Sequence, residues 1–135
     1  MLEQTYSMIK PEIVAADDQK IGEMLAIIQR AGFRIRNLQM KQLDRETVET
    51  FYDVHKERPF FGELVEYISS GPVVAMHLER EDAIVKLREL LGATNPADAA
   101  CGTLRDLFGT SLTQNAIHAS DSPENGLREI GIIFG

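Results

Sequence analysis

Residues 73–78 of the chain read VVAMHL, and this short run decides how the rest of the sequence can fold. A nearly continuous apolar stretch of this length is typical of a strand buried inside a sheet. Ser69-Ser70-Gly71-Pro72 precedes it and breaks the pattern that comes before. We therefore predict a buried strand over Val73–Leu78 and look for its covering helices on either side.

Upstream of this strand, two helical patterns form a hairpin. Asp44 can cap the first helix, and the second begins after Arg58-Pro59. Their apolar positions are Val48, Phe51, Tyr52 and His55, then Phe61, Leu64, Val65 and Ile68. Further upstream, residues 33–43 predict a strand, and a change of phase near Asn37 indicates a β-bulge.

The N-terminal stretch predicts a strand, a loop and a helix. Gln4–Ile9 alternates and must end at Lys10-Pro11, because proline restrains its predecessor and cannot donate to a ladder. A loop of mixed charge follows. Ile21, Met24, Leu25 and Ile28 then recur at helical spacing, and Gly32 suits a left-handed helix end.

Downstream of the buried strand, a helix over residues 82–91 ends at Gly92, with Arg88 in its apolar stripe. Residues 93–102 form a long aperiodic loop of a kind that is often functional. A helical turn over 103–108 and a strand over Leu112–His118 follow. A last helix begins at Ser122-Pro123, with Leu127, Ile130, Gly131 and Phe134 directed inward.

Helices separate the strands of this order, which predicts an α/β (α+β sandwich) fold in which helices cover one sheet. The chain has 135 residues, of which 44% are hydrophobic. That length and composition suit one domain with one core, so we expect residues 1–135 to form a single domain.

Charge and cysteine content exclude several classes of protein. The formal net charge of −7 at pH 7 opposes electrostatic capture by a nucleic-acid backbone or an anionic membrane. No run of eighteen apolar residues occurs, and the N-terminus does not resemble a secretory signal. The lone Cys101 cannot form an internal disulfide. We expect a cytoplasmic protein with no nucleic acid as its main partner and no membrane association.

The chain has three histidines, and none has a second histidine or cysteine at metal-ligand spacing, so a zinc site is not expected. We interpret His55 and His77 as core or interface residues. His118 differs because it ends a strand just before Ser120-Asp121-Ser122, where a helix begins. The pattern around it leaves a structural and a functional role equally open.

A phosphate-binding site would have to be built from side chains, because no glycine-rich phosphate loop occurs in the sequence. The candidate cations, which stand at the ends of elements, are Lys10, Arg58, Arg88 and Arg105. With the hydroxyls of Tyr52 and Thr94 they could form a charge-assisted clamp. The sequence alone does not bring them together.

Six motifs, in order along the chain, carry a resemblance. They are MIKP at 8–11, RPFF at 58–61, SGPVVAM at 70–76, GATNPAD at 92–98, GTLR at 102–105 and NAIHASDS at 115–122. In these motifs the sequence resembles the nucleoside diphosphate kinase family. The resemblance implies a ferredoxin-like βαββαβ core, with a four-stranded antiparallel sheet covered by helices. It also implies ping-pong transfer of the γ-phosphate of a nucleoside triphosphate, mainly ATP, to a nucleoside diphosphate.

The resemblance also implies a role for each matching residue. His118 would carry the phosphoryl group, and Glu129 with Ser120 would fix its ring. Lys10, Tyr52 and Asn115 would lie near the transferred phosphate and the ribose, and Arg88, Thr94 and Arg105 would hold the outer phosphates, while Arg58 would be structural. Phe60 would stack on the base, with Leu112 opposite and Leu64 beneath, which predicts broad base tolerance.

The implied cofactor is Mg²⁺, held mainly by the phosphates, with Asp121 acting on it through water. The implied partners are nucleoside di- and triphosphates and further copies of the chain, in a homo-oligomer built from dimers, either a tetramer or a hexamer. Three positions depart from the family pattern. Glu12-Ile13 replaces the usual Asp-Gly, Ala119 replaces a glycine, and Asp106-Leu107 replaces Gly-Asp.

Two other functions compete with this interpretation. A histidine phosphocarrier would exchange phosphate with partner proteins through His118 and would need no aromatic clamp, so Phe60 and Leu112 count against it. A nucleotide-sensing module of the same fold would bind without turnover. The presence of His118 together with Glu129 and Asn115 disfavours that second alternative.

Overall fold

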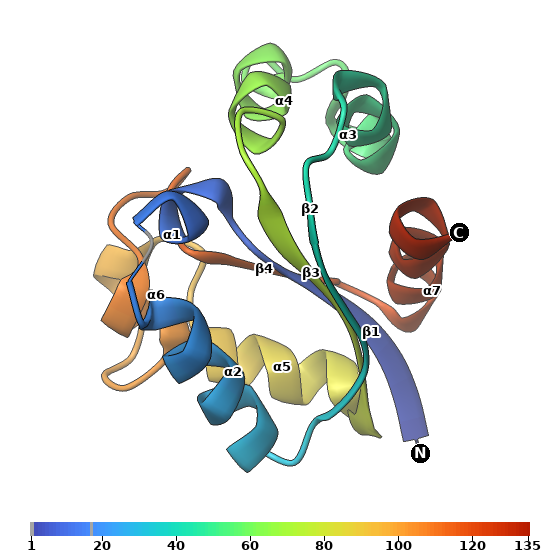
Figure 1. The fold of residues 1–135 in the computed structure, drawn as a ribbon. Coiled ribbons are helices and arrows are strands. Elements are labelled where there is room, and N and C mark those ends of the chain that lie inside the picture. Colours follow the sequence, from blue (N-terminus) through green and yellow to red (C-terminus); the bar gives the residue numbers. More distant parts are fainter. Residues whose placement is uncertain (1, 17) are drawn as a thin grey trace.

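The computed structural model describes residues 2–16 and 18–135. Its centre is a four-stranded sheet in the order β2-β3-β1-β4, in which every neighbouring pair is antiparallel (Figure 1). The strands are β1 (Leu2–Ile9), β2 (Arg34–Lys41), β3 (Val73–Glu81) and β4 (Ile117–Ala119). The ferredoxin-like antiparallel sheet is therefore confirmed.

Strand β3 contains the apolar run Val73–Leu78, and it lies between β2 and β1. Val74, Met76 and Leu78 belong to one hydrophobic core, whereas Val73 and Ala75 belong to another on the opposite face. Because side chains alternate between the faces of a strand, a nearly continuous apolar run requires a helical layer on both sides.

The helices supply these two layers. One core includes residues from α1 (Pro11–Ala16), α2 (Lys20–Arg30), α5 (Ala83–Leu91) and α6 (Leu104–Phe108). The other includes residues from α3 (Arg45–Phe51), α4 (Phe61–Ile68) and α7 (Pro123–Phe134). Figure 1 shows α2 and α5 on one side of the sheet and α3, α4 and α7 on the other. Short 3₁₀ turns occupy Asp53–His55 and Pro96–Asp98.

Several local predictions are confirmed. The register between β2 and β3 shifts between Ile35 and Asn37, as expected for a bulge. The Asp44 side chain accepts the Thr47 N–H at 2.7 Å, and Ser122 accepts the Asn125 N–H at 3.1 Å, so both caps form. Gly92 ends α5 with a φ of 86°, a conformation that favours glycine.

Two predicted elements are wrong, the loop after Lys10 and the last strand. The expected loop after Lys10 contains the short helix α1, whose first residue is Pro11, a position that suits proline. The last strand covers only Ile117–Ala119 instead of Leu112–His118. Its partner β1 ends at Ile9 and the chain then turns into α1, so residues before Ile117 have no strand to pair with.

The inward face of α7 agrees with the prediction only in part, because Ile130 and Phe134 pack against the core as expected whereas Gly131 is exposed. Leu127 is 60% exposed, whereas Gly126, Glu129 and Ile133 are buried. A side chain at Gly126 would come within 3.0 Å of the Gln4 carbonyl oxygen, so glycine lets the helix approach β1 closely. This approach brings Glu129 beneath β4.

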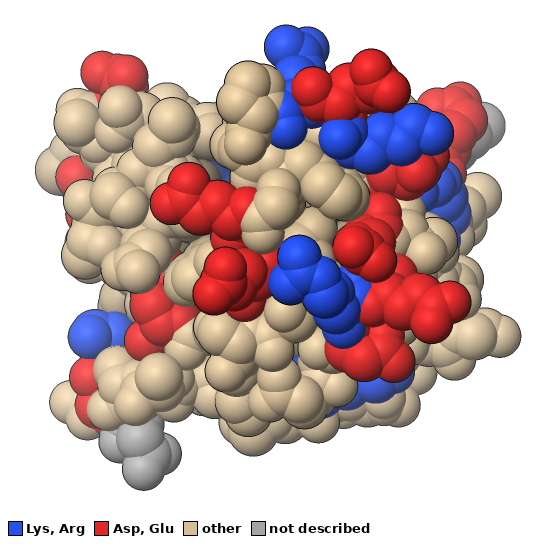
Figure 2. Space-filling view, turned by 90° about the horizontal axis from the view of Figure 1, so that it is seen from above, with Lys and Arg blue, Asp and Glu red and all other residues tan. Residues whose placement is uncertain are grey.

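On the face shown in Figure 2, basic side chains lie next to acidic ones, and uncharged residues form much of the remaining surface. Across the described residues, no helix has the length and apolar character needed to cross a bilayer.

Candidate active site

A cavity of about 400 Å³ opens between the α3–α4 hairpin and the loops that precede β4. This volume falls within the range usual for small-ligand sites. Its lining consists of Lys10, Tyr52, His55, Phe60, Glu63, Leu64, Thr94, Arg105, Leu112, Thr113, Asn115 and His118. Most of the site residues expected from the sequence therefore meet in one place, although they come from opposite ends of the chain.

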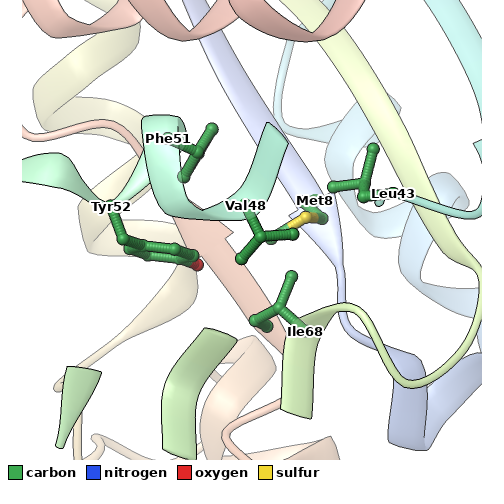
Figure 3. Close-up of a pocket in the computed structure, with 6 residues that line it drawn as sticks. All are labelled: Met8, Leu43, Val48, Phe51, Tyr52 and Ile68. Carbon is green, nitrogen blue, oxygen red and sulfur yellow. The ribbon is translucent and has the colours of Figure 1, made fainter. Parts of the chain in front are cut away.

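A second void lies under Tyr52, among Met8, Leu43, Val48, Phe51 and Ile68 (Figure 3). It belongs to the hydrophobic core between the sheet and the hairpin, and it has no room for a water molecule. We attribute it to side-chain packing.

His118 lies on β4, and both its backbone and its ring are held. The Ser7 hydroxyl donates to the His118 carbonyl oxygen at 2.6 Å, and His118 pairs with Met8 of β1. The ring Nε2 lies 2.9 Å from Glu129 Oε1. A carboxylate accepts hydrogen bonds, so Nε2 carries the proton and Nδ1 keeps its lone pair.

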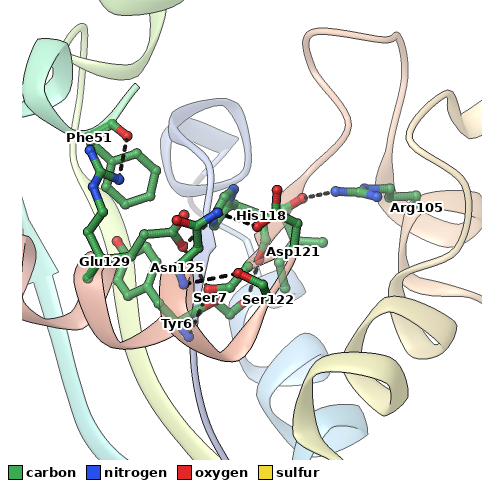
Figure 4. A network of polar contacts seen from close by, with 12 residues as sticks. Tyr6, Ser7, Phe51, Arg105, His118, Asp121, Ser122, Asn125 and Glu129 are labelled. Atoms are coloured by element: carbon green, nitrogen blue, oxygen red, sulfur yellow. Dashed lines mark hydrogen bonds and ion pairs between the residues drawn. The ribbon is translucent and has the colours of Figure 1, made fainter. Parts of the chain in front are cut away.

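Glu129 is itself fixed by a neighbour (Figure 4). The Ser120 hydroxyl donates to Glu129 Oε1 at 2.7 Å, and the same hydroxyl oxygen accepts the Tyr6 N–H at 3.2 Å. The side chains of His118 and Glu129 are only 17% and 9% exposed. The Ser120–Glu129–His118 chain is thus mostly shielded from solvent, which strengthens its electrostatic contacts.

Three aromatic rings lie near the imidazole. The ring centroids of Phe51, Tyr6 and Tyr52 lie 5.2, 5.8 and 6.5 Å from that of His118. Phe51 and Tyr52 meet it edge-on, at interplanar angles of 68° and 86°. Burial raises the pKa of Tyr52, and the charge of Glu129 adds to the rise, so its hydroxyl stays protonated.

Lys10 supplies a buried cation at the floor of the cavity. It is 8% exposed, and its Nζ donates to Asn115 Oδ1 at 2.6 Å and to the Thr113 carbonyl oxygen at 3.4 Å. Burial lowers the pKa of Lys10 to about 8; the Glu12 charge opposes this change, and the Arg105 charge adds to it.

Arg105 places a second cation in the same cavity. Its guanidinium donates to the carbonyl oxygens of Gly92, at 3.1 Å, and Ile117, at 2.9 Å, while its buried Nε has no hydrogen-bond partner within the part of the chain that the structure describes. Burial and then the charge of Arg88 lower the pKa of Arg105 to about 10. The charge of Arg105 disfavours that of Lys10, and the charge of Arg88 disfavours that of Arg105, so this end of the cavity is a cationic region that would bind an anion.

The opposite end of the cavity is apolar and open. Phe60 is 47% exposed and Leu112 is 59% exposed, and both line the cavity. The His55 ring lies between Phe60 and Tyr52, with centroids 5.5 and 6.4 Å away. An aromatic wall at one end and cations at the other suit a ligand with a flat apolar part and a charged tail.

The remaining predicted residues lie outside the cavity lining. Ser120 and Glu129 lie behind His118. Arg88 is exposed on α5, beside Arg105 rather than in the wall. Arg58 is exposed in the turn before α4, and Asp121 is exposed and accepts a hydrogen bond from the Asn125 side chain.

The sequence interpretation missed three lining residues, which are His55, Glu63 and Thr113. His55 does not belong to the core, because its side chain is only partly buried and lines the cavity; its place at an interface stays a prediction. The sequence contained one indication of this position: His55 follows Tyr52 by three residues, and residues at that spacing in a helical segment face the same way. His77 is partly buried in β3, where it bonds to the Gln4 side chain.

No group of three or more histidine, cysteine or acidic side chains among residues 2–16 and 18–135 is arranged to hold a metal ion. The donors in the cavity are mostly cationic and neutral, and Glu63 is the acidic residue in its lining.

Comparisons with known proteins by sequence and by structure indicate one family. The family model described as "Nucleoside diphosphate kinase" matches residues 3–135. The nucleoside diphosphate kinase of Chlamydia felis is 52% identical over 133 residues, which cover 98% of this chain and 93% of the relative. That of Hyphomonas neptunium is 50% identical over 133 residues, with coverages of 98% and 94%.

Solved structures agree with these sequence matches. The Aquifex aeolicus nucleoside diphosphate kinase superposes with a TM-score of 0.96 at 45% identity, covering 100% of this chain and 96% of that one. The Halobacterium salinarum enzyme, solved in complex with CDP, gives a TM-score of 0.93 at 37% identity, with coverages of 99% and 88%. The chain belongs to the nucleoside diphosphate kinase family, whose members transfer phosphate between nucleoside triphosphates and diphosphates.

Proposed function

We propose that this chain transfers the γ-phosphate of a nucleoside triphosphate, mainly ATP, to a nucleoside diphosphate through a phosphohistidine at His118. One observation carries the proposal. The imidazole lines a cationic cavity while its Nε2 is bound to the buried Glu129, which leaves Nδ1 free to attack.

The chemistry consists of two half-reactions at one site. In the first, the Nδ1 lone pair forms a bond to the γ-phosphorus, the bond from that phosphorus to the bridging oxygen breaks, and the diphosphate leaves with the electron pair. In the second, a terminal oxygen of the acceptor diphosphate attacks the same phosphorus, and the P–N bond breaks. Kinetics should therefore be ping-pong.

Glu129 supports both steps by stabilising the positive charge that develops on the ring when Nδ1 bonds to phosphorus. Ser120 holds the carboxylate in place. Lys10, Arg105 and Arg88 would position the phosphates and neutralise their charge. Phosphoryl transfer through a loose transition state depends mainly on these two effects.

The cavity suggests how a nucleotide would lie. Its base would stack on Phe60, with Leu112 opposite and Leu64 beneath, and stacking alone tolerates any base. The transferred phosphate and the ribose would lie near Lys10, Tyr52 and Asn115. The outer phosphates would be held by Arg105, Thr94 and the adjacent exposed Arg88. The CDP complex of the Halobacterium salinarum relative supports a diphosphate as ligand.

Mg²⁺ fits this donor set as an ion that arrives with the nucleotide. It prefers phosphate oxygens and water over a cage of protein ligands, and it neutralises phosphate charge. Asp121 would act on it through water, from the N-terminal end of α7.

We also infer a homo-oligomer built from dimers, either a tetramer or a hexamer. Strand β2 lies at the edge of the sheet and exposes Leu38 and Met40, at 43% and 61%. An open edge with exposed apolar side chains is suited to pairing with a second copy. A single domain over residues 1–135 and a cytoplasmic location also remain predictions.

Incubation with γ-labelled ATP and no acceptor tests the function. The protein should gain acid-labile, base-stable label, and unlabelled diphosphate should then remove it as labelled triphosphate. His118→Ala should abolish the label. His77→Ala is the matched control, because His77 lies outside the cavity and should leave labelling intact.

The outcomes separate the three candidate functions. Label that survives acid, or that persists in His118→Ala, would end the phosphohistidine proposal. Label that no nucleoside diphosphate removes would favour the phosphocarrier. Binding without any label would favour the sensing module.

A further inference from the structure

The chain enters β4 through an unusual backbone conformation at Ala116. Its φ is 80°, and among the described residues Asp82 is the other non-glycine residue with positive φ. Residues with a side chain disfavour this region, because Cβ approaches the backbone. The conformation persists only where surrounding contacts hold it.

Two hydrogen bonds from the junction of β1 and α1 hold Ala116. The Lys10 N–H donates to the Ala116 carbonyl oxygen at 2.8 Å. The Ala116 N–H donates to Glu12 Oε2 at 2.9 Å. Both backbone polar groups of Ala116 are therefore hydrogen-bonded, one to the Lys10 backbone and the other to the Glu12 side chain.

The neighbours of Ala116 belong to the proposed phosphate end of the cavity. Asn115 accepts a hydrogen bond from Lys10 Nζ at 2.6 Å and donates to the Thr94 carbonyl oxygen at 2.9 Å. His118 follows two residues later, on β4. A change of backbone conformation at Ala116 would therefore displace Asn115 and its contact with Lys10.

Glu12 is partly buried, although a desolvated carboxylate is costly. Its Oε1 is buried and has no hydrogen-bond partner among the described residues. Burial raises the pKa of Glu12, while its hydrogen bonds and the Lys10 charge oppose the rise. The same carboxylate charge opposes the lowering of the Lys10 pKa.

We propose that Glu12 is a positioning residue: its carboxylate pins Ala116 in the left-handed conformation and thereby holds Asn115 and Lys10 in place for phosphate binding. The inference rests on the proposed function for its catalytic consequence. It also gives a role to one position at which the chain departs from the family pattern, where Glu12 stands for the usual aspartate.

Three variants test the pin. Glu12→Ala removes the hydrogen bond and should lower kcat/KM by about tenfold or more, as expected for the loss of a bond to a charged acceptor. Ala116→Gly should act like the unchanged protein, because glycine adopts positive φ freely. The double variant Glu12→Ala/Ala116→Gly should recover most of the lost kcat/KM, since a glycine at this position adopts positive φ without the hydrogen bond from Glu12.

A second readout needs no substrate. Amide hydrogen exchange should show the Ala116 N–H protected in the unchanged protein and unprotected in Glu12→Ala. Glu23→Gln on α2 is the matched control, because it changes an exposed carboxylate away from the cavity. It should leave both exchange and kcat/KM unchanged.

The pH profile separates positioning from simple packing. Glu12→Gln keeps an oxygen that can accept the Ala116 N–H but removes the charge that favours protonated Lys10. The alkaline limb of kcat/KM should therefore move to lower pH. The other ionisable groups around the cavity are Arg105 from α6, Tyr52 and His55 from the α3 end, Glu63 from α4 and His118 from β4, and none of them is changed.

The inference is overturned if Glu12→Ala retains full kcat/KM, if Glu12→Ala/Ala116→Gly recovers none of the loss, or if Glu12→Gln leaves the alkaline limb in place. These outcomes differ from failure of the proposed function, in which the unchanged protein would take no label from ATP. In that case the exchange of the Ala116 amide would still report whether Glu12 holds the backbone.

Discussion

Replacing Glu129 by glutamine tests how the buried carboxylate contributes to phosphoryl transfer. The amide oxygen can still accept the hydrogen bonds that His118 Nε2 and the Ser120 hydroxyl now make, at 2.9 and 2.7 Å. The side chain keeps its size, so the fold should survive. Only the negative charge is lost.

The magnitude follows from the geometry. A full unit charge on the ring would interact with the carboxylate by about 4 kcal/mol at 4 Å and an effective dielectric constant of about 20. The ring gains only part of that charge in a loose transition state. We therefore expect a loss of about 1.5 to 2.5 kcal/mol, which is roughly 10- to 70-fold in the rate of phosphorylation. The low exposure of Glu129, 9%, keeps screening by water small.

The assay is the single-turnover rate of labelling from γ-labelled ATP, measured with the melting temperature of each variant. Glu124→Gln is the matched control, because Glu124 is exposed in the first turn of the same helix. It should phosphorylate at the unchanged rate. A folded Glu129→Gln protein that also labels at the unchanged rate would refute the electrostatic role.

Three further predictions concern binding, pH and stability. Because the pKa of Lys10 is lowered to about 8, this cation is present below that pH, and kcat/KM should fall as pH rises through it; Lys10→Arg should move the fall to higher pH. Phe60→Ala should weaken every nucleotide by about 1 to 3 kcal/mol in titration calorimetry, and a loss confined to purines or pyrimidines would contradict stacking. Ser122→Ala removes the cap that accepts the Asn125 N–H, so the free energy of unfolding in urea should fall by about 1 kcal/mol; an unchanged value would show that the cap does not stabilise α7.

Local signals predicted much of the fold because each acts within a few residues. The cap at Asp44, the bulge near Asn37 and the glycine that ends α5 each follow from neighbouring sequence and each formed. The prediction of a strand over Leu112–His118 was wrong because strand formation depends on a distant partner as well as on the local sequence. Alternation predicts an extended chain, but a strand also needs a partner, and β1 ends too early to provide one.

The site shows the same division. Its residue types could be selected from the sequence by chemistry and family resemblance, because a polyphosphate ligand without a glycine-rich loop requires cationic side chains. The contact of Glu12 with Ala116 could not be predicted from the sequence, since it joins residues 104 positions apart. His55 was misplaced because a helical stripe indicates a shared face without showing whether core or cavity lies against it.

The sequence by itself determined most of the strands and helices, their main caps and the set of groups able to handle phosphate, since these depend on local backbone preference and side-chain chemistry. Only the tertiary structure decided that Lys10, Arg105 and His118 share one cavity and that Glu129 lies beneath the imidazole. These contacts join distant segments, and their geometry is fixed by how the sheet pairs and how closely α7 packs upon it.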